Sequence, residues 1–392
     1  MRKAISYLII SLSFSINAQI DYSKLIVGRT TGEQLMHDGA IVRTFGFAET
    51  LGDDIKVPGP TIEVTEGDSI EFDFWNVSQG APHTIHLHGL DVNQENDGVP
   101  SLSFEVLHME HGFYKFKAPH PGTYIYHCHV VSTIHVQAGM YGVIIVQPSN
   151  GNQNQVWNDG EIYGRDLLWT SSEIDTNWHT ATVLDHEHSS TAPHYVPADY
   201  EPQYFIINGE SETQLAQESG YYYTGQNEKV YMRLVNIGYY GVRYIFPSSL
   251  NATTIASDGR PLPSSFMSDT IEVLPGERYG TMIETGTDIL YPVVVEYFNL
   301  NNQVVESSQN VIIKTSPLGI DSENITGIKV TPNPSGSGVF NINSDKLVDY
   351  SIYSILGELI IHGNSSAIDL SDEPNGMYFL QTENSIQKLI KK

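Results

Sequence analysis

Two histidine-rich segments hold the residues of this chain whose side chains are best suited to bind a metal. They occupy residues 83–89 and 127–140. Successive side chains of a strand point to opposite faces of the sheet, so residues two apart share a face. This alternation predicts two separate ligand sets. The first contains His83 and Cys128 with His135 and Met140 of the following loop, and the second contains His86, His88, His127 and His129.

The first set combines two imidazoles, one thiolate and one thioether. A trigonal site of two His and one Cys with a weak axial Met is typical of electron-transfer copper, called type 1. Cys128, His135 and Met140 lie on one strand end and the loop after it, so a single loop can present three ligands. Scattered histidines around a buried structural cysteine are the alternative. We predict a type 1 copper site.

The second set offers four imidazoles and no thiolate. Two pairs with i, i+2 spacing on neighbouring strands point into one space, which suits copper bound as a type 2 or a coupled type 2/type 3 centre. His127 and His129 flank Cys128 in the chain, so an electron has a short through-bond route between the two sets. The alternative is a polar patch in which the histidines only form hydrogen bonds.

Charge and cysteine content exclude several classes of protein. The 392 residues include 46 Asp and Glu against 20 Lys and Arg, a formal net charge of −26. Nucleic acids and anionic membranes are bound by clustered basic residues, so neither is expected as a partner. The single cysteine excludes an intrachain disulfide and any zinc or iron–sulfur site built on several cysteines.

The N-terminal residues predict export. Arg2 and Lys3 precede an apolar run over residues 4–16, and Ala18 supplies a small residue at its exit. This order is typical of a secretory signal peptide cleaved near Ala18, and the run is too short to span a membrane. Export permits disulfides, which a single cysteine cannot form within the chain, so Cys128 is better explained as a metal ligand or a reactive thiol than as a structural bridge.

The strand pattern predicts an all-β protein. Helical periodicity is almost absent, and short alternating runs are separated by Gly, Pro, Asn and Asp. A polar turn, an alternating strand and an Asn recur at residues 66–76 and 226–236, which indicates two copies of one β-sandwich plan. The expected bounds are a signal peptide at 1–18, a first sandwich at 19–150, a second at 151–315, a linker at 316–325 and a small β domain at 326–392.

Several motifs resemble those of the multicopper oxidases. Residues 86–89 (HLHG) resemble that family's HxHG motif, and residues 122–129 resemble its second HxH motif, with Cys128 where that domain usually has Ser. Together with His83, His135 and Met140, this is similar to the type 1 copper domain of two-domain oxidases and copper nitrite reductases. Further resemblances lie at residues 58–62, 66–68, 97–100, 207–209, 233–236, 257–259 and 275–279.

The resemblance implies two tandem cupredoxin-like Greek-key β-sandwiches and an oxidase with dioxygen as acceptor. The electron donor would be a small molecule or a metal ion. In two-domain members the coupled copper cluster lies between subunits of a homotrimer, whose neighbouring second domain supplies ligands. The second unit of this chain departs from the pattern, because its strands contain no HxH pair. Loop histidines are candidates to complete the centre, with a solvated loop as the alternative: His179, His186, His188 and His194.

The C-terminal unit resembles the sorting domain of the type IX secretion system. The matching residues are 332–334 (PNP), 353–358, 375–379 and the terminal lysines. An ordinary small β interaction module is the alternative. The resemblance implies transport by the type IX machinery and a place outside the cell, secreted or at the cell surface.

Three functions fit these residues. The leading prediction is a secreted copper oxidoreductase that passes electrons from the type 1 copper to the histidine-bound centre, where dioxygen is reduced. The first alternative is a blue-copper electron-transfer or copper-binding protein without oxidase activity. The second is a nitrite-reductase-like enzyme with one extra copper held mainly by His88 and His127. Asp91 or Asp97 could relay protons, although Asp97 beside Gly98 also fits a turn.

Overall fold

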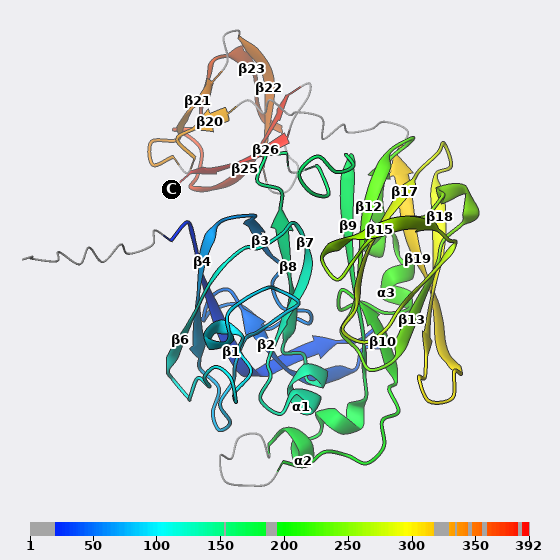
Figure 1. Ribbon diagram of the computed structural model, residues 1–392. Helices are drawn as coiled ribbons and strands as arrows, with labels where there is room; N and C mark the ends of the chain where they lie inside the picture. The colour runs from blue at the N-terminus through cyan, green and yellow to red at the C-terminus, as the bar shows by residue number, and fades with distance from the viewer. Residues whose placement is uncertain are drawn as a thin grey trace, which may run out of the picture. The chain divides into compact units, whose positions relative to one another are not determined.

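The computed structural model describes residues 20–152, 154–185, 194–316, 329–333, 335–343, 347–354, 359–382 and 386–391. The predicted signal peptide and nearly all of the predicted linker lie outside these residues. The chain divides into two compact units, residues 1–318 and 319–392. Within the described residues, no helix is long and apolar enough to cross a membrane. Strands dominate throughout, which confirms the predicted all-β class (Figure 1).

The first sandwich places a four-stranded sheet in the order β2-β1-β4-β6 against a second in the order β3-β8-β7-β5. Side chains of β4 alternate between buried and half-buried, as expected for a strand with one face on a core. The core includes Phe45, Phe72 and Ile144. The strands are β1 (Tyr22–Leu35), β2 (Ile41–Ala48), β3 (Ile62–Thr65), β4 (Ser69–Asn76), β5 (His86–His88), β6 (His111–Lys117), β7 (Gly122–His127) and β8 (Tyr141–Gln147).

The second sandwich follows the same two-layer plan. One sheet has the order β10-β9-β12-β17-β14-β15 and the other β11-β19-β18-β13-β16. Trp169, Leu234 and Val293 belong to its core. The strands are β9 (Arg165–Ile174), β10 (Tyr204–Ile207), β11 (Tyr222–Gly225), β12 (Lys229–Asn236), β13 (Gly241–Ile245), β14 (Thr253–Ser257), β15 (Arg260–Met267), β16 (Thr270–Val273), β17 (Arg278–Glu284), β18 (Leu290–Phe298) and β19 (Val305–Ser316).

The two sandwiches are joined by an apolar layer that covers the outer face of β7 and β8. Ile125 and Val143 of the first sandwich pack in one cluster with Ile206 and Val235 of the second. Every residue of β7 and β8 is therefore buried, as in strands covered on both faces. The strand that leads to Cys128 is thus held rigidly between two layers.

Short helices connect the strands. The one that matters for the site is α1 (Ser132–Gln137), which links β7 to β8. The others are η1 (Gln94–Asn96), η2 (Thr176–His179), α2 (Ala181–Leu184), α3 (Thr213–Ala216), η4 (Glu218–Gly220) and η5 (Ser248–Leu250).

The C-terminal unit has a core of its own, which includes Phe340, Ile352, Ile368 and Leu380. Its sheets have the orders β20-β21-β24 and β23-β22-β25-β26. The strands are β20 (Lys329–Thr331), β21 (Val339–Asn343), β22 (Val348–Ser354), β23 (Leu359–Ser365), β24 (Ala367–Asp369), β25 (Gly376–Thr382) and β26 (Ile386–Lys391).

Candidate metal centre

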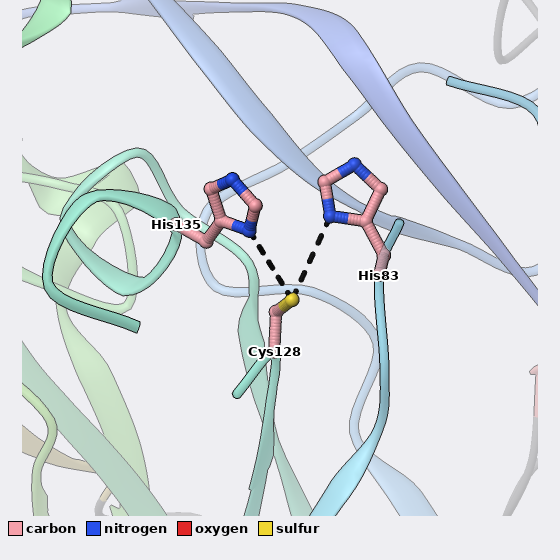
Figure 2. A group of neighbouring side chains, drawn as sticks. All are labelled: His83, Cys128 and His135. Atoms are coloured by element: carbon pink, nitrogen blue, oxygen red, sulfur yellow. Dashed lines mark hydrogen bonds between the residues drawn. The ribbon is translucent and has the colours of Figure 1, made fainter. Parts of the chain in front are cut away.

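Three of the four residues of the first predicted ligand set, His83, Cys128 and His135, form a compact cluster in the first sandwich (Figure 2). The Sγ atom of Cys128 lies 3.6 Å from Nδ1 of His83 and 3.3 Å from Nδ1 of His135. All three side chains have 0% exposure. They form one of the two groups among the described residues whose donor atoms are close enough to share a metal ion.

Backbone pairing at the end of β7 positions three of the four residues. The Cys128 N–H donates to the carbonyl of Met140 at 3.0 Å, and the Met140 N–H donates to the carbonyl of His135 at 2.9 Å. The loop through α1 is thereby closed on itself. The Met140 side chain is fully buried in the same apolar cluster as Cys128. His83 comes from another segment, which forms an isolated bridge to Val106.

The donor atoms of this cluster fit a transition metal. Nitrogen and sulfur ligands held about 2.0 and 2.3 Å from one ion lie about 3.5 Å apart at a tetrahedral angle. The observed separations of 3.3 and 3.6 Å match that spacing. A thiolate with two imidazoles and a nearby Met is also the donor set of blue copper. The donor atoms of Cys128, His83 and His135 are therefore close enough to share one metal ion.

The second predicted set gathers at β5 and the end of β7. His86, His88 and His127 form the other group with donor atoms close enough to share an ion. Nδ1 of His88 lies 3.3 Å from Nε2 of His127. His129 stands beside them, with its ring centroid 5.1 Å from that of His86, but it lies outside the three-residue group. The alternation along β5 and β7 thus agrees with the separation of His86, His88 and His127 from Cys128.

Two carbonyl groups orient the histidines of the second cluster. Nδ1–H of His86 donates to the carbonyl of Asp97 at 2.7 Å, and Nδ1–H of His127 donates to the carbonyl of Cys128 at 3.0 Å. Both Nε2 atoms are left as acceptors, as in histidines that bind metals. The glycine after Asp97 allows the chain to pass close to β5. Gly98 has a φ of +79°, and a Cβ there would lie 1.9 Å from the carbonyl oxygen of Ile85.

Burial keeps the second cluster uncharged. It lowers the pKa of His88 to about 4, with a further contribution from the Arg278 charge. Burial also lowers the pKa of His127 to about 3, and the neighbouring imidazoles add to this effect. Neutral imidazole is the form that binds metals, so the cluster is ready for a cation at neutral pH.

The second sandwich contributes an arginine at the edge of this cluster. Arg278 of β17 is 4% exposed, and its guanidinium contacts Asp258 at 3.1 Å and the carbonyl of Gly276 at 2.7 Å. Its Nη2 would lie 2.1 Å from a Cβ added to Gly89. Sequence reasoning noted residues 275–279 only as a weak family motif, and an arginine after a turn gives no signal for such a contact.

The loop histidines do not join the second cluster within the described residues. His179 is buried and its Nδ1–H donates to the carbonyl of Arg43 at 2.6 Å. His194 is exposed, and neither residue belongs to a metal-binding group. His186 and His188 lie outside the described residues.

A buried carboxyl group stands between the second sandwich and α1. Glu173 is 1% exposed and accepts hydrogen bonds from Tyr200 Oη at 3.0 Å and from the backbone N–H groups of Tyr239 and Tyr240. The Tyr239 hydroxyl in turn donates to the carbonyl of Thr133 in α1 at 2.6 Å. This network connects the second sandwich to the helix that carries His135.

Glu173 predicts a pH-dependent stability. Burial raises its pKa from 4.5 to about 7, so between these values the folded protein holds one more proton than the unfolded chain. The contribution of the protonated Glu173 to the free energy of unfolding is fully present below pH 4.5. It is lost as the pH rises to about 7, which lowers the free energy of unfolding by about 3 kcal/mol. Glu173→Gln removes that loss. We expect the difference in unfolding free energy between variant and wild type to grow by this amount from pH 4.5 to 8, measured by chemical denaturation. Parallel pH profiles of the two proteins would contradict it.

Comparison with known proteins places these clusters in context. Two multicopper oxidase family models match residues 43–151 and 174–316, and a model of the secretion system C-terminal sorting domain matches residues 329–392. Laccase-15 of Oryza sativa subsp. japonica is 27% identical over 248 residues, covering 58% of this chain and 37% of its own length. The copper-containing nitrite reductase of Neisseria meningitidis serogroup B is 37% identical over 118 residues, covering 30% of this chain and 28% of its own. The chain thus spans about a third of the length of these curated relatives.

Solved structures share the fold. The blue copper oxidase from Nitrosomonas europaea has a TM-score of 0.60 and 23% identity, covering 78% of this chain and 90% of its own. The multicopper oxidase mgLAC has a TM-score of 0.58 and 24% identity, covering 78% and 89%. The predicted cupredoxin-like sandwiches and the C-terminal sorting domain are confirmed.

Proposed function

Because the chain belongs to the multicopper oxidase family, whose two models together match more than half of it, we propose that it is an exported copper-dependent oxidoreductase. It would take electrons from a small-molecule or metal-ion donor and deliver them to dioxygen. The observation that carries this proposal is the placement of the two clusters, since Cys128 of the first lies between His127 and His129 of the second in the chain.

Eight side chains would hold the copper. His83, Cys128, His135 and Met140 would form the type 1 site, and His86, His88, His127 and His129 a type 2 or coupled type 2/type 3 site. Copper bound at these places would supply one-electron transfer at the first site and reduction of the acceptor at the second. The close donor atoms of six of these residues and the full burial of the first site support this assignment.

The protein itself holds the proposed ligands in place, excludes water from the first site and connects the two clusters through covalent bonds. The closed loop through α1 and the two-sided burial of β7 fix Cys128 and His135 in place, so little rearrangement would accompany a change of charge. The zero exposure of the first cluster excludes water. His127 is bound to the carbonyl of Cys128 at 3.0 Å as well as through the peptide bond, which gives two short paths from one cluster to the other.

The ends of the chain support export. We propose that residues 1–18 act as a cleaved signal peptide and that residues 326–392 are recognised by the type IX secretion machinery, which would leave the protein secreted or at the cell surface. The sorting-domain match supports the second step. For the rest we propose domain bounds of 19–150 and 151–315, and a homotrimer as the assembly that would complete the second centre.

Copper stoichiometry tests the proposal. The mature chain is loaded with copper, and the metal per chain, the electron paramagnetic resonance spectrum and oxygen consumption are measured. We expect a blue type 1 signal, further copper at the second centre and consumption of oxygen. A blue signal alone would favour the electron-transfer protein.

Nitrite reduction is a second candidate, favoured by the 37% identity to the Neisseria enzyme over 118 residues and by the close approach of His88 and His127. An added type 2 signal with nitrite turnover, and without oxygen consumption, would establish it instead.

A further inference from the structure

A segment of the second sandwich packs into the apolar core that contains the first cluster. This segment, residues 175–185, is called the cap here and contains η2 and α2. Val183 and Leu184 have 1% and 0% exposure and belong to the same apolar cluster as Cys128 and Met140. All four proposed ligands of the first site have 0% exposure. No surface of either imidazole is therefore open to a molecule in solution.

The cap is attached firmly to the first sandwich. His179 donates from Nδ1 to the carbonyl of Arg43 at 2.6 Å, and the guanidinium of Arg43 contacts Asp185 at 2.5 Å. Both attachments reach one residue of β2, two positions from Phe45, whose ring lies 5.8 Å from that of His135. The cap is thus fixed next to the ligand loop at two of its positions.

The start of the cap is equally fixed to its own sandwich. The Asp175 carboxylate accepts hydrogen bonds from the N–H groups of Asn177 at 2.9 Å and Glu201 at 2.7 Å. The indole of Trp178 donates to the carbonyl of Asp199 at 2.9 Å. A segment with this many buried contacts opens only at a cost in free energy.

We infer that the cap determines which electron donors the protein accepts. A phenol that must contact an imidazole ligand is excluded, and the donor is an outer-sphere one-electron reductant that works across the protein surface. The net charge of −26 favours a cationic donor of this class. This inference rests on the proposed function, of which it specifies the donor, and the residues that carry it are His179, Val183, Leu184 and Asp185.

The sole cysteine allows the cap to be tested without copper. Thiol labelling of the metal-free full-length chain is followed with a small reagent, methyl methanethiosulfonate, and a bulky one, dithiobisnitrobenzoate. Val183→Ala/Leu184→Ala should raise the labelling rate of Cys128 about tenfold or more, because lost packing of two buried side chains favours local opening. Asp185→Asn, at an exposed position, weakens the contact with Arg43 and should raise the labelling rate of Cys128 by a smaller factor. This variant replaces the double variant in the test if the double variant does not fold.

A matched control separates the cap from the rest of the core. Ile70 of β4 has 0% exposure and belongs to the same apolar cluster, but lies on the opposite sheet from Cys128. Ile70→Ala should leave the labelling rate near that of wild type. An equal rise in this control, or no rise in either cap variant, overturns the inference.

The donor class is tested on the copper-loaded protein. Anaerobic bleaching of the blue absorption is followed with hexaammineruthenium(II), a cationic outer-sphere donor, and with 2,6-dimethoxyphenol. The blue absorption of the wild type should bleach with the ruthenium complex, and at least about tenfold more slowly with the phenol. In the double variant the rate with the phenol should rise, while the rate with the ruthenium complex should stay unchanged. Fast phenol oxidation by wild type overturns the inference. A protein that binds no blue copper would instead refute the proposed function, while the labelling result still reports on the cap.

Discussion

Replacing Cys128 by serine is expected to abolish the blue absorption and the type 1 copper signal. The Sγ atom belongs to the only cysteine in the chain and lies within 3.6 Å of both imidazoles of its cluster. A hydroxyl group is nearly the same size but is not a soft ligand for copper. Loss of a group that only hydrogen-bonds to a metal ligand lowers metal affinity or activity about 10- to 100-fold. Loss of a ligand itself should therefore reduce oxidase activity by more than about 100-fold.

The comparison variant for this test is Met140→Leu. It preserves an apolar side chain of similar volume in the buried site and leaves Cys128, His83 and His135 unchanged. It should retain the blue absorption, because a type 1 site depends only weakly on its axial ligand. Circular dichroism should show both variants folded. A Cys128→Ser protein that still absorbs as strongly as wild type would refute the assignment of the type 1 site.

Period-two alternation was enough to separate His86, His88 and His127 from Cys128. His86 and His88 of β5 share a face, and His127 pairs with His86 across to β7. Because parity is a local property of a strand, the sequence alone separates these residues from Cys128. His135, the proposed ligand from the loop, was predicted from its residue type and its nearness to Cys128 in the chain. The helix α1 that carries it was missed, since six residues are too few to show a helical period.

Contacts between the sandwiches could not be predicted in this way. Arg278 approaches Gly89 across nearly 200 positions of the chain, and no local pattern reports such a contact. The same holds for the cap. His179 is attractive by residue type as a ligand of the second centre, yet it is placed by a carbonyl of β2 and by burial beside Val183 and Leu184. Strands β7 and β8 also lose the usual alternation because both their faces are covered.

Replacing His88 by alanine is expected to abolish oxygen consumption by changing the second cluster alone. His88 is the best choice there, because His127 is bonded directly to Cys128 and His86 is held by Asp97. Its Nδ1 lies 3.3 Å from Nε2 of His127, so its removal takes away a central donor atom. The blue absorption should persist, since no residue of the first cluster changes. Copper at the second centre and oxygen consumption should fall together, the latter by more than about 100-fold.

The control for this variant is His111→Ala. That histidine stacks on Trp75 with ring centroids 5.3 Å apart, and its Nδ1 contacts Asp73. Neither partner belongs to the two clusters. It should leave copper content and oxygen consumption unchanged, which shows that loss of an arbitrary imidazole is harmless. If His88→Ala keeps full oxygen consumption and full copper content, the acceptor is reduced elsewhere. If it loses copper but keeps reduction of the blue site by the donor, the result supports the proposal that electrons enter at Cys128 and leave through the histidine cluster.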